Sequence, residues 1–379
     1  MDPLLRYARD RQAQIIAFIR EMVECETPSG DAAAIGRFVE LFRERTGDIA
    51  TFRTKPGGTW GPHLICEFTL PGRKQGGHVL GLGHSDTVYP MGVLKSMPWR
   101  ETKERLHGPG VLDMKAGLAF FVFAMRALKE LEIPVARKVL LQLNSEEEVG
   151  SPSSRSLTEK NARGARAVLV LEPGTGLAGK LKTARKGIGR YQIDVFGQSA
   201  HAGVDFTAGA SAIVEMAHQI QAVAALTDLT KGRTLNPGVL SGGTRSNVIA
   251  DRATCEVDLR VETLRDAAVV DRRLRALKAR NKRCRLEVTG ELNRPPMERS
   301  PGIAQLFALA KTCGQRFGAT VEESSTGGGS DGNFTAALGV PTLDGLGAVG
   351  EGAHAPHESV LKERIADRVA LLAHLTATL

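Results

Sequence analysis

Several histidine and carboxylate side chains directly follow short apolar runs, a position from which they could bind a metal ion. His84 and Asp86 come at the end of the run at residues 79–83. A histidine at the end of a strand can ligate a metal, and an aspartate two positions on can orient its ring. Glu172 closes the run at residues 168–171 in the same way. A single histidine is more often structural, so the pattern gains weight only if these positions converge.

Carboxylates also stand beside two turns rich in glycine. Asp113 follows a Gly-Pro-Gly turn and precedes an apolar helix, where it could cap the helix or be held so that it bridges two cations. Three consecutive glutamates, residues 146–148, follow the apolar run at residues 139–143. Carboxylates this close repel one another unless a cation compensates, although an exposed acidic loop would also explain them. The turn at Gly150, which follows at once, favours the cation.

These side chains converge if the apolar runs are neighbouring strands of one sheet. The runs at residues 79–83, 139–143 and 168–171 are short enough for buried strands, and a helix is expected at about 115–130. Strand–helix–strand order predicts an α/β fold, a catalytic mixed sheet flanked by helices, with functional residues at the carboxyl ends of its strands. Histidine and carboxylate ligands suit zinc and need no cysteine. His354, in Gly-Ala-His, is a further candidate ligand.

A second domain is indicated from about residue 186, where the hydrophobic pattern changes to strict alternation. Apolar residues alternate at 191–195 and again at 255–261, which is typical of half-exposed strands. Helical stretches are expected at about 208–226 and 264–280. The sequence therefore predicts an inserted α+β domain. The predicted domains are 1–183 with 293–379 for the α/β domain, and 184–292 for the insertion.

The net charge of +8 is concentrated in one segment. Residues 271–285 hold eight basic residues and one acidic residue. A basic helix can bind nucleic acid or an anionic surface, but a charge run is more often a solvated helix face. No aromatic platform accompanies the run, so we expect no nucleic-acid partner.

The cysteines and the hydropathy of the sequence indicate the cellular compartment in which the protein is expected. The five cysteines are odd in number and at least 29 residues apart, which argues against disulfides and against a CxxC site. The longest uninterrupted apolar run has eight residues, against roughly 20 for a membrane span. The N-terminus has no apolar core of a signal peptide. We expect a cytoplasmic protein without a membrane partner, or a periplasmic one if a signal peptide was removed.

Seven motifs occur in an order that resembles a known family. They are GHSDTV, GPGVLDMKAG, NSEEEVGS, LEPG, SAHAG, GGGSD and GAH. Together they resemble the dinuclear zinc amidohydrolases that include glutamate carboxypeptidase, acetylornithine deacetylase, succinyl-diaminopimelate desuccinylase and aminoacylase. The resemblance spans roughly residues 15 to 378. It is greatest to glutamate carboxypeptidase, through HSDTVYP, TGGGSD and NRPP.

The resemblance implies two zinc ions per chain and a role for each candidate residue. Met114 departs from the pattern, because many relatives carry a second acid after the bridging aspartate, and in relatives that peptide is cis. The triple glutamate leaves the register open, and Gly150-Ser151 decides it in favour of Glu147 and Glu148. Asp113 would bridge the two zinc ions, with His84 and Glu172 completing one site and Glu148 and His354 completing the other. Glu147 would be the general base, and Asp86 would orient the His84 ring.

The resemblance also implies that residues 1–183 with 293–379 form a catalytic zinc domain, and that the insertion is a lid and dimerisation domain with contacts to substrate. His201 would reach the active site of a partner subunit in a homodimer and help to hold the reacting carbonyl. Asn247 and Arg260 would recognise a substrate carboxylate, which arginine binds in bidentate fashion. Gly328 and Gly329 would offer backbone N–H groups close to the substrate. Lys180 and Arg294 could meet a second substrate carboxylate, or could equally be ordinary surface cations.

These expectations define a zinc metallocarboxypeptidase that hydrolyses the amide bond next to a C-terminal amino acid. Glutamate is the expected released residue, and a water activated by two zinc ions is the expected nucleophile. The alternative within the family is an N-acyl-amino-acid deacylase. A non-catalytic protein that binds partners through its basic surface is less favoured, because the set of ligands and base is complete.

Overall fold

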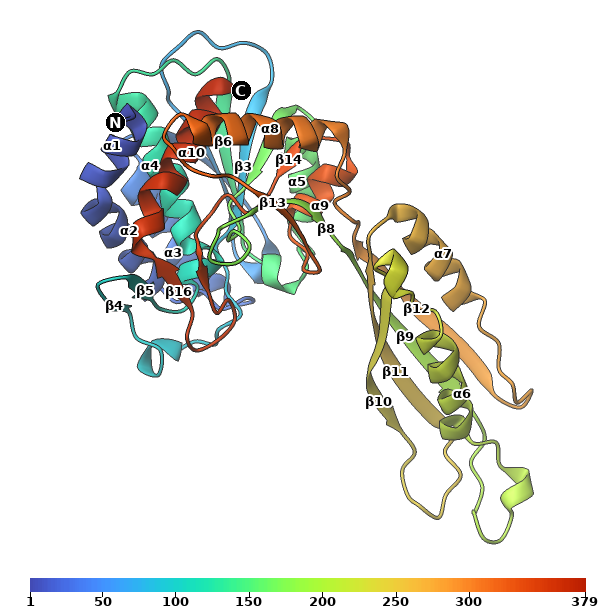
Figure 1. Ribbon diagram of the computed structural model, residues 1–379. Helices are drawn as coiled ribbons and strands as arrows, with labels where there is room; N and C mark the ends of the chain where they lie inside the picture. The colour runs from blue at the N-terminus through green and yellow to red at the C-terminus, as the bar shows by residue number, and fades with distance from the viewer. The chain divides into compact units, whose positions relative to one another are not determined.

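The computed structural model describes residues 1–379, which divide into two units (Figure 1). The larger unit consists of Met1–Ala184, Arg299–Thr326 and Ser330–Leu379, and the smaller of Arg185–Glu298 and Gly327–Gly329. The second boundary differs from the predicted position at 292/293. Strand β12 (Arg285–Arg294) continues past that position, and the residues up to Glu298 stay with the smaller unit.

The larger unit is built on a six-stranded mixed sheet. The three apolar runs are strands, as predicted, and they lie next to one another in the sheet as parallel neighbours. β1 and β2 extend the sheet in antiparallel fashion at one edge, and β14 pairs with β7 in parallel at the other. In spatial order the strands are β1 (Ala50–Lys55), β2 (His63–Phe68), β6 (Lys138–Asn144), β3 (His78–His84), β7 (Ala165–Val170) and β14 (Thr342–Leu343).

Helices cover both faces of this sheet, which explains the continuous apolar runs. Val79, Leu141 and Leu169 face the main core, which contains the almost wholly buried helix α4 (Ala116–Glu130). Leu80 and Val168 face the opposite side, in a second apolar cluster next to β7. On the first side α4 contacts α1 (Pro3–Asp10), α2 (Gln12–Glu24) and α10 (Ile365–Thr378), while α5 (Arg155–Ala162) and α9 (Gly332–Ala337) contact β7 (Figure 1).

The remaining elements of the larger unit are short or peripheral. Helix α3 (Ala32–Thr46) begins after Asp31, whose side chain accepts a hydrogen bond from the N–H of Ala34. Helix α8 (Pro301–Gln315) contacts α10 and β14. The remaining strands form two small sheets. One has the strand order β15 (Gly350–Glu351), β16 (Ser359–Leu361), β5 (Arg105–His107) and β4 (Arg100–Glu101), and the other pairs β13 (Glu323–Thr326) with β8 (Leu181–Arg185).

The smaller unit is a four-stranded antiparallel sheet with two helices. Its strand order is β10 (Thr234–Gly242), β11 (Arg252–Val261), β9 (Gly187–Phe196) and β12, and its helices are α6 (Ala212–Ala224) and α7 (Leu264–Arg275). The predicted alternation is confirmed, because every second residue of β9 and β11 is buried in one core with residues of both helices.

Helix α7 is shorter than the sequence predicts, because residues 276–284 leave the helix. The buried Glu215 carboxylate accepts hydrogen bonds from the N–H groups of Arg280 and Asn281, at 2.9 Å each, and so holds this segment against α6. Part of the basic segment is also committed within the fold. Arg275 pairs with Asp271, and Arg283 donates to the carbonyl of Thr207.

None of the helices combines the length and the apolar character that a membrane span would need. All five cysteines are free thiols, as their spacing predicts.

Candidate metal centre

The five predicted metal ligands come from five separate segments of the larger unit that meet at one edge of its main sheet. His84 is the last residue of β3, Glu172 lies just after β7, and Glu148 belongs to the short turn η4 (Glu147–Val149) after β6. Asp113 lies in the irregular turn Val111–Lys115 before α4, and His354 lies between β15 and β16. The carboxyl ends of neighbouring parallel strands lie along the same sheet edge, which is why these side chains meet.

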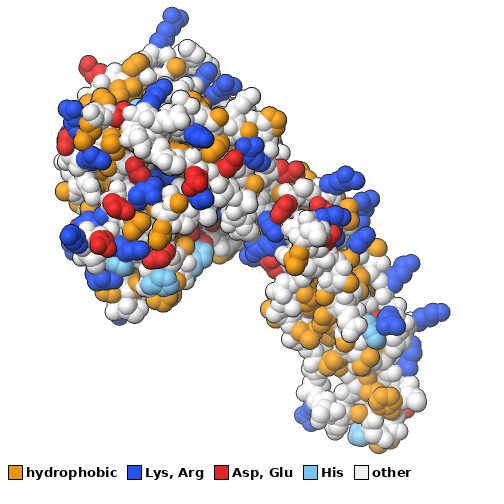
Figure 2. Space-filling model, viewed as in Figure 1, with side chains coloured by type: hydrophobic (Ala, Val, Ile, Leu, Met, Phe, Trp, Pro, Cys, Tyr) orange, Lys and Arg blue, Asp and Glu red, His pale blue; other side chains and the backbone are white.

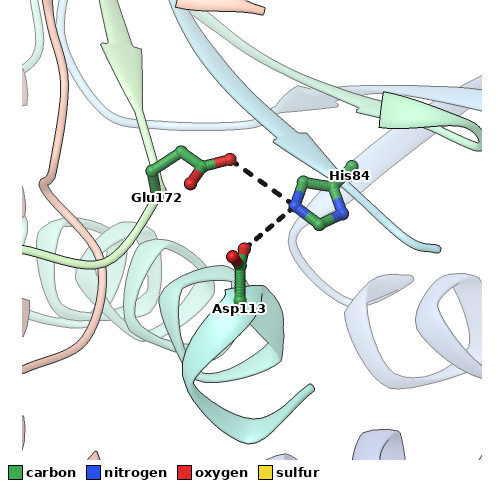
Figure 3. A group of neighbouring side chains, drawn as sticks. All are labelled: His84, Asp113 and Glu172. Atoms are coloured by element: carbon green, nitrogen blue, oxygen red, sulfur yellow. Dashed lines mark hydrogen bonds and ion pairs between the residues drawn. The ribbon is translucent and has the colours of Figure 1, made fainter. Parts of the chain in front are cut away.

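Their side chains form two groups that share Asp113, and Figure 3 shows the first of them, His84 with Asp113 and Glu172. In the first, His84 Nε2 lies 3.2 Å from Asp113 Oδ1 and 3.5 Å from Glu172 Oε1. In the second, His354 Nε2 lies 3.4 Å from Asp113 Oδ2 and 3.2 Å from Glu148 Oε2. The two oxygens of Asp113 therefore face different groups, the arrangement that a bridging ligand requires.

The donor set fits a pair of metal ions. Each group offers one imidazole nitrogen and carboxylate oxygens, which zinc accepts. Glu148 Oε1 is buried and has no hydrogen-bond partner, although a buried carboxylate oxygen is normally satisfied. An ion bound at the second group would supply the missing partner.

Protons and metal ions compete for this cluster. Hydrogen bonds to Asp113 and Glu148 raise the pKa of His354 to about 10. Burial lowers the pKa of His84, but hydrogen bonds to Asp113, Asp86 and Glu172 outweigh burial and hold the pKa well above its usual value. The carboxylates are thus compensated by imidazolium when no metal is bound. Metal binding requires neutral imidazole and so releases these protons.

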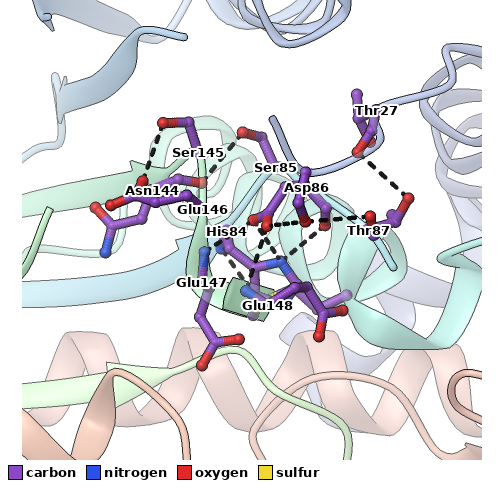
Figure 4. A network of polar contacts seen from close by, with 12 residues as sticks. Thr27, His84, Ser85, Asp86, Thr87, Asn144, Ser145, Glu146, Glu147 and Glu148 are labelled. Carbon is purple, nitrogen blue, oxygen red and sulfur yellow. Dashed lines mark hydrogen bonds and ion pairs between the residues drawn. The ribbon is translucent and has the colours of Figure 1, made fainter. Parts of the chain in front are cut away.

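Asp86 does more than the sequence predicts (Figure 4). Its carbonyl oxygen lies 2.9 Å from His84 Nδ1, closer than its carboxylate at 3.4 Å, so the ring is oriented mainly by the backbone. The carboxylate accepts hydrogen bonds from the N–H groups of Glu147 and Glu148, at 3.1 and 3.3 Å. Asp86 therefore links the ligand His84 to the loop that carries the predicted base.

The three glutamates occupy three different environments. Glu146 is fully buried, and its carboxylate accepts hydrogen bonds from the N–H groups of Ser153 and Ser154 and from the Ser145 hydroxyl. Glu148 belongs to the second metal group. Glu147 lies between them, half-buried. With Glu146 engaged by the fold and Glu148 by the metal group, this arrangement supports the register in which Glu147 is the base.

Glu358 was missed by sequence reasoning. This buried carboxylate accepts hydrogen bonds from the N–H groups of Gly110, Leu112 and Asp113, at 3.0, 2.7 and 3.0 Å, and from the Tyr89 hydroxyl at 2.7 Å. It therefore holds the backbone that presents Asp113. The pairing joins residues about 250 positions apart and leaves no periodic trace in the sequence.

Met114 has a packing role where many relatives carry an acid. Its sulfur lies 3.3 Å from the backbone nitrogen of His84, and its side chain fills the space beside Gly83. The Asp113–Met114 peptide is cis, as the resemblance implies.

The predicted substrate residues of the smaller unit fall in two groups. His201 and Asn247 are both exposed, and their segments lie side by side: His201 forms a bridge with Val248, and the N–H of Ala202 donates to the carbonyl of Asn247, which lies in a turn. His201 Nδ1 accepts hydrogen bonds from the N–H groups of Gly203 and Val204, at 3.1 Å each. The imidazole is exposed, with its Nδ1 held by the backbone of the next residues.

Arg260 and the glycine loop form the second group. The Arg260 guanidinium donates to both carboxylate oxygens of Asp258, at 2.8 and 3.0 Å, so it is not the unpaired cation that a simple carboxylate clamp would use. It also donates to the carbonyl of Gly327 at 3.2 Å. Arg185 donates to the carbonyls of Gly328 and Gly329, at 3.2 and 3.0 Å, which turns the carbonyls of this loop toward arginines.

The two candidates for a second substrate carboxylate differ from each other. Lys180 forms an exposed ion pair with Glu322 at 3.4 Å, as an ordinary surface cation does. Arg294 is buried in the smaller unit, and its Cδ lies against Gly329.

Two histidine–carboxylate groups that share an aspartate, at the carboxyl edge of an α/β sheet, define the class of two-metal hydrolases. Residues 81–378 match the model of the peptidase family M20/M25/M40. The chain is 30% identical over 357 residues to carboxypeptidase G2 of Pseudomonas sp. (strain RS-16), covering 93% of this chain and 85% of that protein. The chain belongs to the M20/M25/M40 family and is a metallohydrolase.

Solved structures show the same fold. Aminopeptidase PepT from Bacillus cereus superposes with a TM-score of 0.83 at 24% identity, over 97% of this chain and 98% of that one. An M20 family metallo-carboxypeptidase from Sulfolobus solfataricus superposes with a TM-score of 0.72 at 16% identity, over 96% of this chain and 98% of that one. Both likenesses extend over both units.

Proposed function

We propose that this chain is a dinuclear zinc carboxypeptidase that hydrolyses the amide bond next to a free C-terminal amino acid, with glutamate as the released residue. The observation that carries the proposal is Asp113, whose two carboxylate oxygens face two separate histidine–carboxylate groups. The likeness to carboxypeptidase G2 supports the choice of carboxypeptidase over other amide hydrolases of the family.

Each residue of the site has a definite task in this proposal. His84, Asp113 and Glu172 would hold one ion, and Asp113, Glu148 and His354 the other. When bound, the two ions supply Lewis acidity, which lowers the pKa of water and polarises the scissile carbonyl. Glu147 takes the proton of the attacking water and gives a proton to the leaving amine. Asp86 and Glu358 hold the backbone on either side, so that Glu147 and Asp113 need not reorganise during the reaction.

The test is a hydrolysis screen with zinc and again after chelation. The panel contains peptides and N-acyl derivatives that end in a free amino acid. Zinc-dependent cleavage of peptidyl or aroyl substrates supports a carboxypeptidase. Activity confined to simple N-acetyl amino acids would replace it by the deacylase, and no zinc-dependent cleavage at all would overturn the proposed hydrolysis.

A free α-carboxylate should be required next to the scissile bond. Asp258 and the Gly327 carbonyl hold the Arg260 guanidinium, whose two outer nitrogens each keep one further N–H to donate, and charged hydrogen bonds of this kind are strong. Amidation of that carboxylate should reduce kcat/KM by roughly 30- to 1,000-fold, or about 2–4 kcal/mol. Equal cleavage of amidated and free substrates would rule out a carboxypeptidase.

The released residue is tested separately, with a matched series that ends in Glu, Gln, Ala or Leu. Arg294 is the preferred candidate for the second carboxylate, because it is buried and a charged hydrogen bond is stronger away from water, whereas Lys180 lies in an exposed ion pair with Glu322. We expect Glu to exceed Gln by about tenfold in kcat/KM. Faster cleavage of Ala or Leu would refute glutamate selectivity and leave the zinc hydrolase intact.

We further propose a homodimer through the smaller unit. Strand β10 is an edge strand of its sheet, and Val239 and Leu240 on it are exposed. Ile213 and Val214 of α6 are exposed as well, and Figure 2 shows hydrophobic side chains gathered on this unit. An unpaired edge with exposed apolar residues favours pairing with a second copy about a two-fold axis.

His201 should act across that dimer. His201→Ala should lower kcat by about 10²-fold without loss of zinc, because the imidazole helps to hold the reacting carbonyl. Mixing this variant with Glu147→Gln should restore activity, to about a quarter of wild type at equal mixing, since half of the dimers then contain one complete site. Verified mixed dimers that stay inactive would place His201 outside the partner's active site.

A further inference from the structure

Asp331 is a buried carboxylate that the proposed chemistry does not use. It is 3% exposed and stands at the start of α9, where an aspartate would ordinarily cap the helix. Its side chain makes no capping hydrogen bond, and the Ser330 hydroxyl instead accepts from the N–H of Gly332 at 3.1 Å. The Asp331 carboxylate is turned to other partners.

Those partners lie on either side of the three glutamates. Asp331 Oδ2 accepts a hydrogen bond from Asn144 Nδ2 at 2.5 Å, and Oδ1 accepts one from the Ser151 hydroxyl. Asn144 ends β6, directly before the glutamates, and Ser151 follows them after the turn at Gly150. One carboxylate therefore joins the two ends of the loop that carries the proposed base and a metal ligand.

The contacts of both partners leave them little freedom. The Asn144 side chain accepts from Gln142 Nε2 at 2.8 Å and donates to the Thr158 hydroxyl at 3.1 Å, within a fully buried network. Ser151 has a φ of +60°, a left-handed conformation that a residue with a Cβ adopts at some cost. Its contact with Asp331 helps to hold that conformation. Buried and satisfied polar networks of this kind make a structure rigid.

The middle of the same loop is held by Asp86, which accepts from the N–H groups of Glu147 and Glu148. We propose that Asp331 is a positioning residue for the loop of residues 145–151, and that it fixes Glu147 and Glu148 by holding the two ends of this loop while Asp86 holds its middle. The loop is then clamped between two buried carboxylates, neither of which reacts. The consequence for catalysis rests on the proposed function, whereas the clamp itself does not.

The first variant is Asp331→Asn, which keeps the shape but offers one acceptor oxygen where the carboxylate offers two, to Asn144 Nδ2 and to the Ser151 hydroxyl. At least one of the two hydrogen bonds to the carboxylate is then lost, and so is the charge that strengthens both. We expect kcat to fall by about 10- to 100-fold, because small misplacements of a catalytic group are costly, with KM changed less than threefold. Ser151→Gly, which removes the hydroxyl but tolerates the positive φ, should act in the same direction.

The sharpest test is an exchange of the two side chains, Asn144→Asp together with Asp331→Asn. The amide of residue 331 can then donate to the new carboxylate and still accept from Ser151, while the Thr158 hydroxyl can reorient to donate. The exchange should restore kcat to within about threefold of wild type. The matched control is Thr335→Val in α9, which removes the buried hydroxyl contacts with Thr342 of β14 and with the Gly332 carbonyl and makes no change in the loop. It should lower the melting temperature and leave kcat unchanged.

Amide hydrogen exchange of residues 144–154 in the metal-free protein supplies a readout that needs no activity. Asp331→Asn should accelerate exchange in this segment by at least about tenfold, the side-chain swap should reverse it, and Thr335→Val should not cause it. Unchanged exchange in Asp331→Asn would overturn the clamp. Accelerated exchange with unchanged kcat would overturn the positioning role. If the wild-type chain hydrolyses no substrate, the proposed function fails, while the exchange result still decides the clamp.

Discussion

Replacing Asp113 with alanine should strip the protein of both metal ions. Asp113 is the one ligand that both groups share, with Oδ1 beside His84 and Oδ2 beside His354. Its removal leaves each group with one histidine and one glutamate, too few protein ligands for a stable zinc site. We expect zinc per chain to fall from two to near zero, and kcat/KM to fall by about 10⁴-fold. Metal analysis after dialysis, together with steady-state kinetics, measures both.

His84→Ala is the matched contrast for this prediction. It removes a ligand of one group only, so about one ion should remain, bound by Asp113, Glu148 and His354. The difference between the two variants isolates the bridging role. An Asp113→Ala protein that still binds one ion as tightly as the wild type would show that the two groups do not share this ligand.

Replacing Glu147 with glutamine should leave a folded protein with both metal ions bound that hydrolyses its substrate very slowly. The amide keeps the volume of the side chain but cannot accept a proton at neutral pH. General acid–base catalysis contributes about 10²–10⁴-fold, and one residue here serves as both base and acid, so we expect a loss of kcat of about 10⁴-fold. Zinc content and melting temperature should match the wild type.

Glu146→Gln is the control for the register of the three glutamates. The Glu146 carboxylate accepts from donors on Ser145, Ser153 and Ser154, and an amide N–H₂ in its place would oppose some of them. This variant should lose stability, by about 1–3 kcal/mol, and keep a larger share of its turnover. The reverse pattern, with stability lost in Glu147→Gln and turnover lost in Glu146→Gln, would assign the base to Glu146.

Much of the site could be predicted because its residues follow strands that are buried on both faces. Helices cover both sides of β3, β6 and β7, so those strands stand out in the sequence as continuous apolar runs. The polar residue after such a run must lie at the sheet edge. This reasoning places His84, the glutamate cluster and Glu172 together. Asp113 and His354 follow no such run; each is a candidate from its glycine-containing surroundings, and only the family resemblance decides between the alternatives for Asp113 and gives each residue its metal site.

What could not be predicted is the set of long-range contacts that support the site. Glu358 holds the backbone at Asp113, and Asp331 joins Asn144 to Ser151. Each is a single carboxylate in an irregular segment, without a periodic pattern to mark it. The same limit applies to Arg260, whose pairing with Asp258 depends on two residues of one strand that point to the same face of the sheet. The end of α7 was misplaced because the buried Glu215 captures the backbone of the following segment.

The central claim is that two metal ions act in one site of this chain. The most direct measurement is a titration of the metal-free wild-type protein with zinc, in which bound metal and hydrolysis of an N-acyl-glutamate are followed in the same samples. Full activity should be reached at two equivalents of bound zinc per chain. Full activity at one equivalent or fewer, or activity that persists in the metal-free protein, would contradict the dinuclear site.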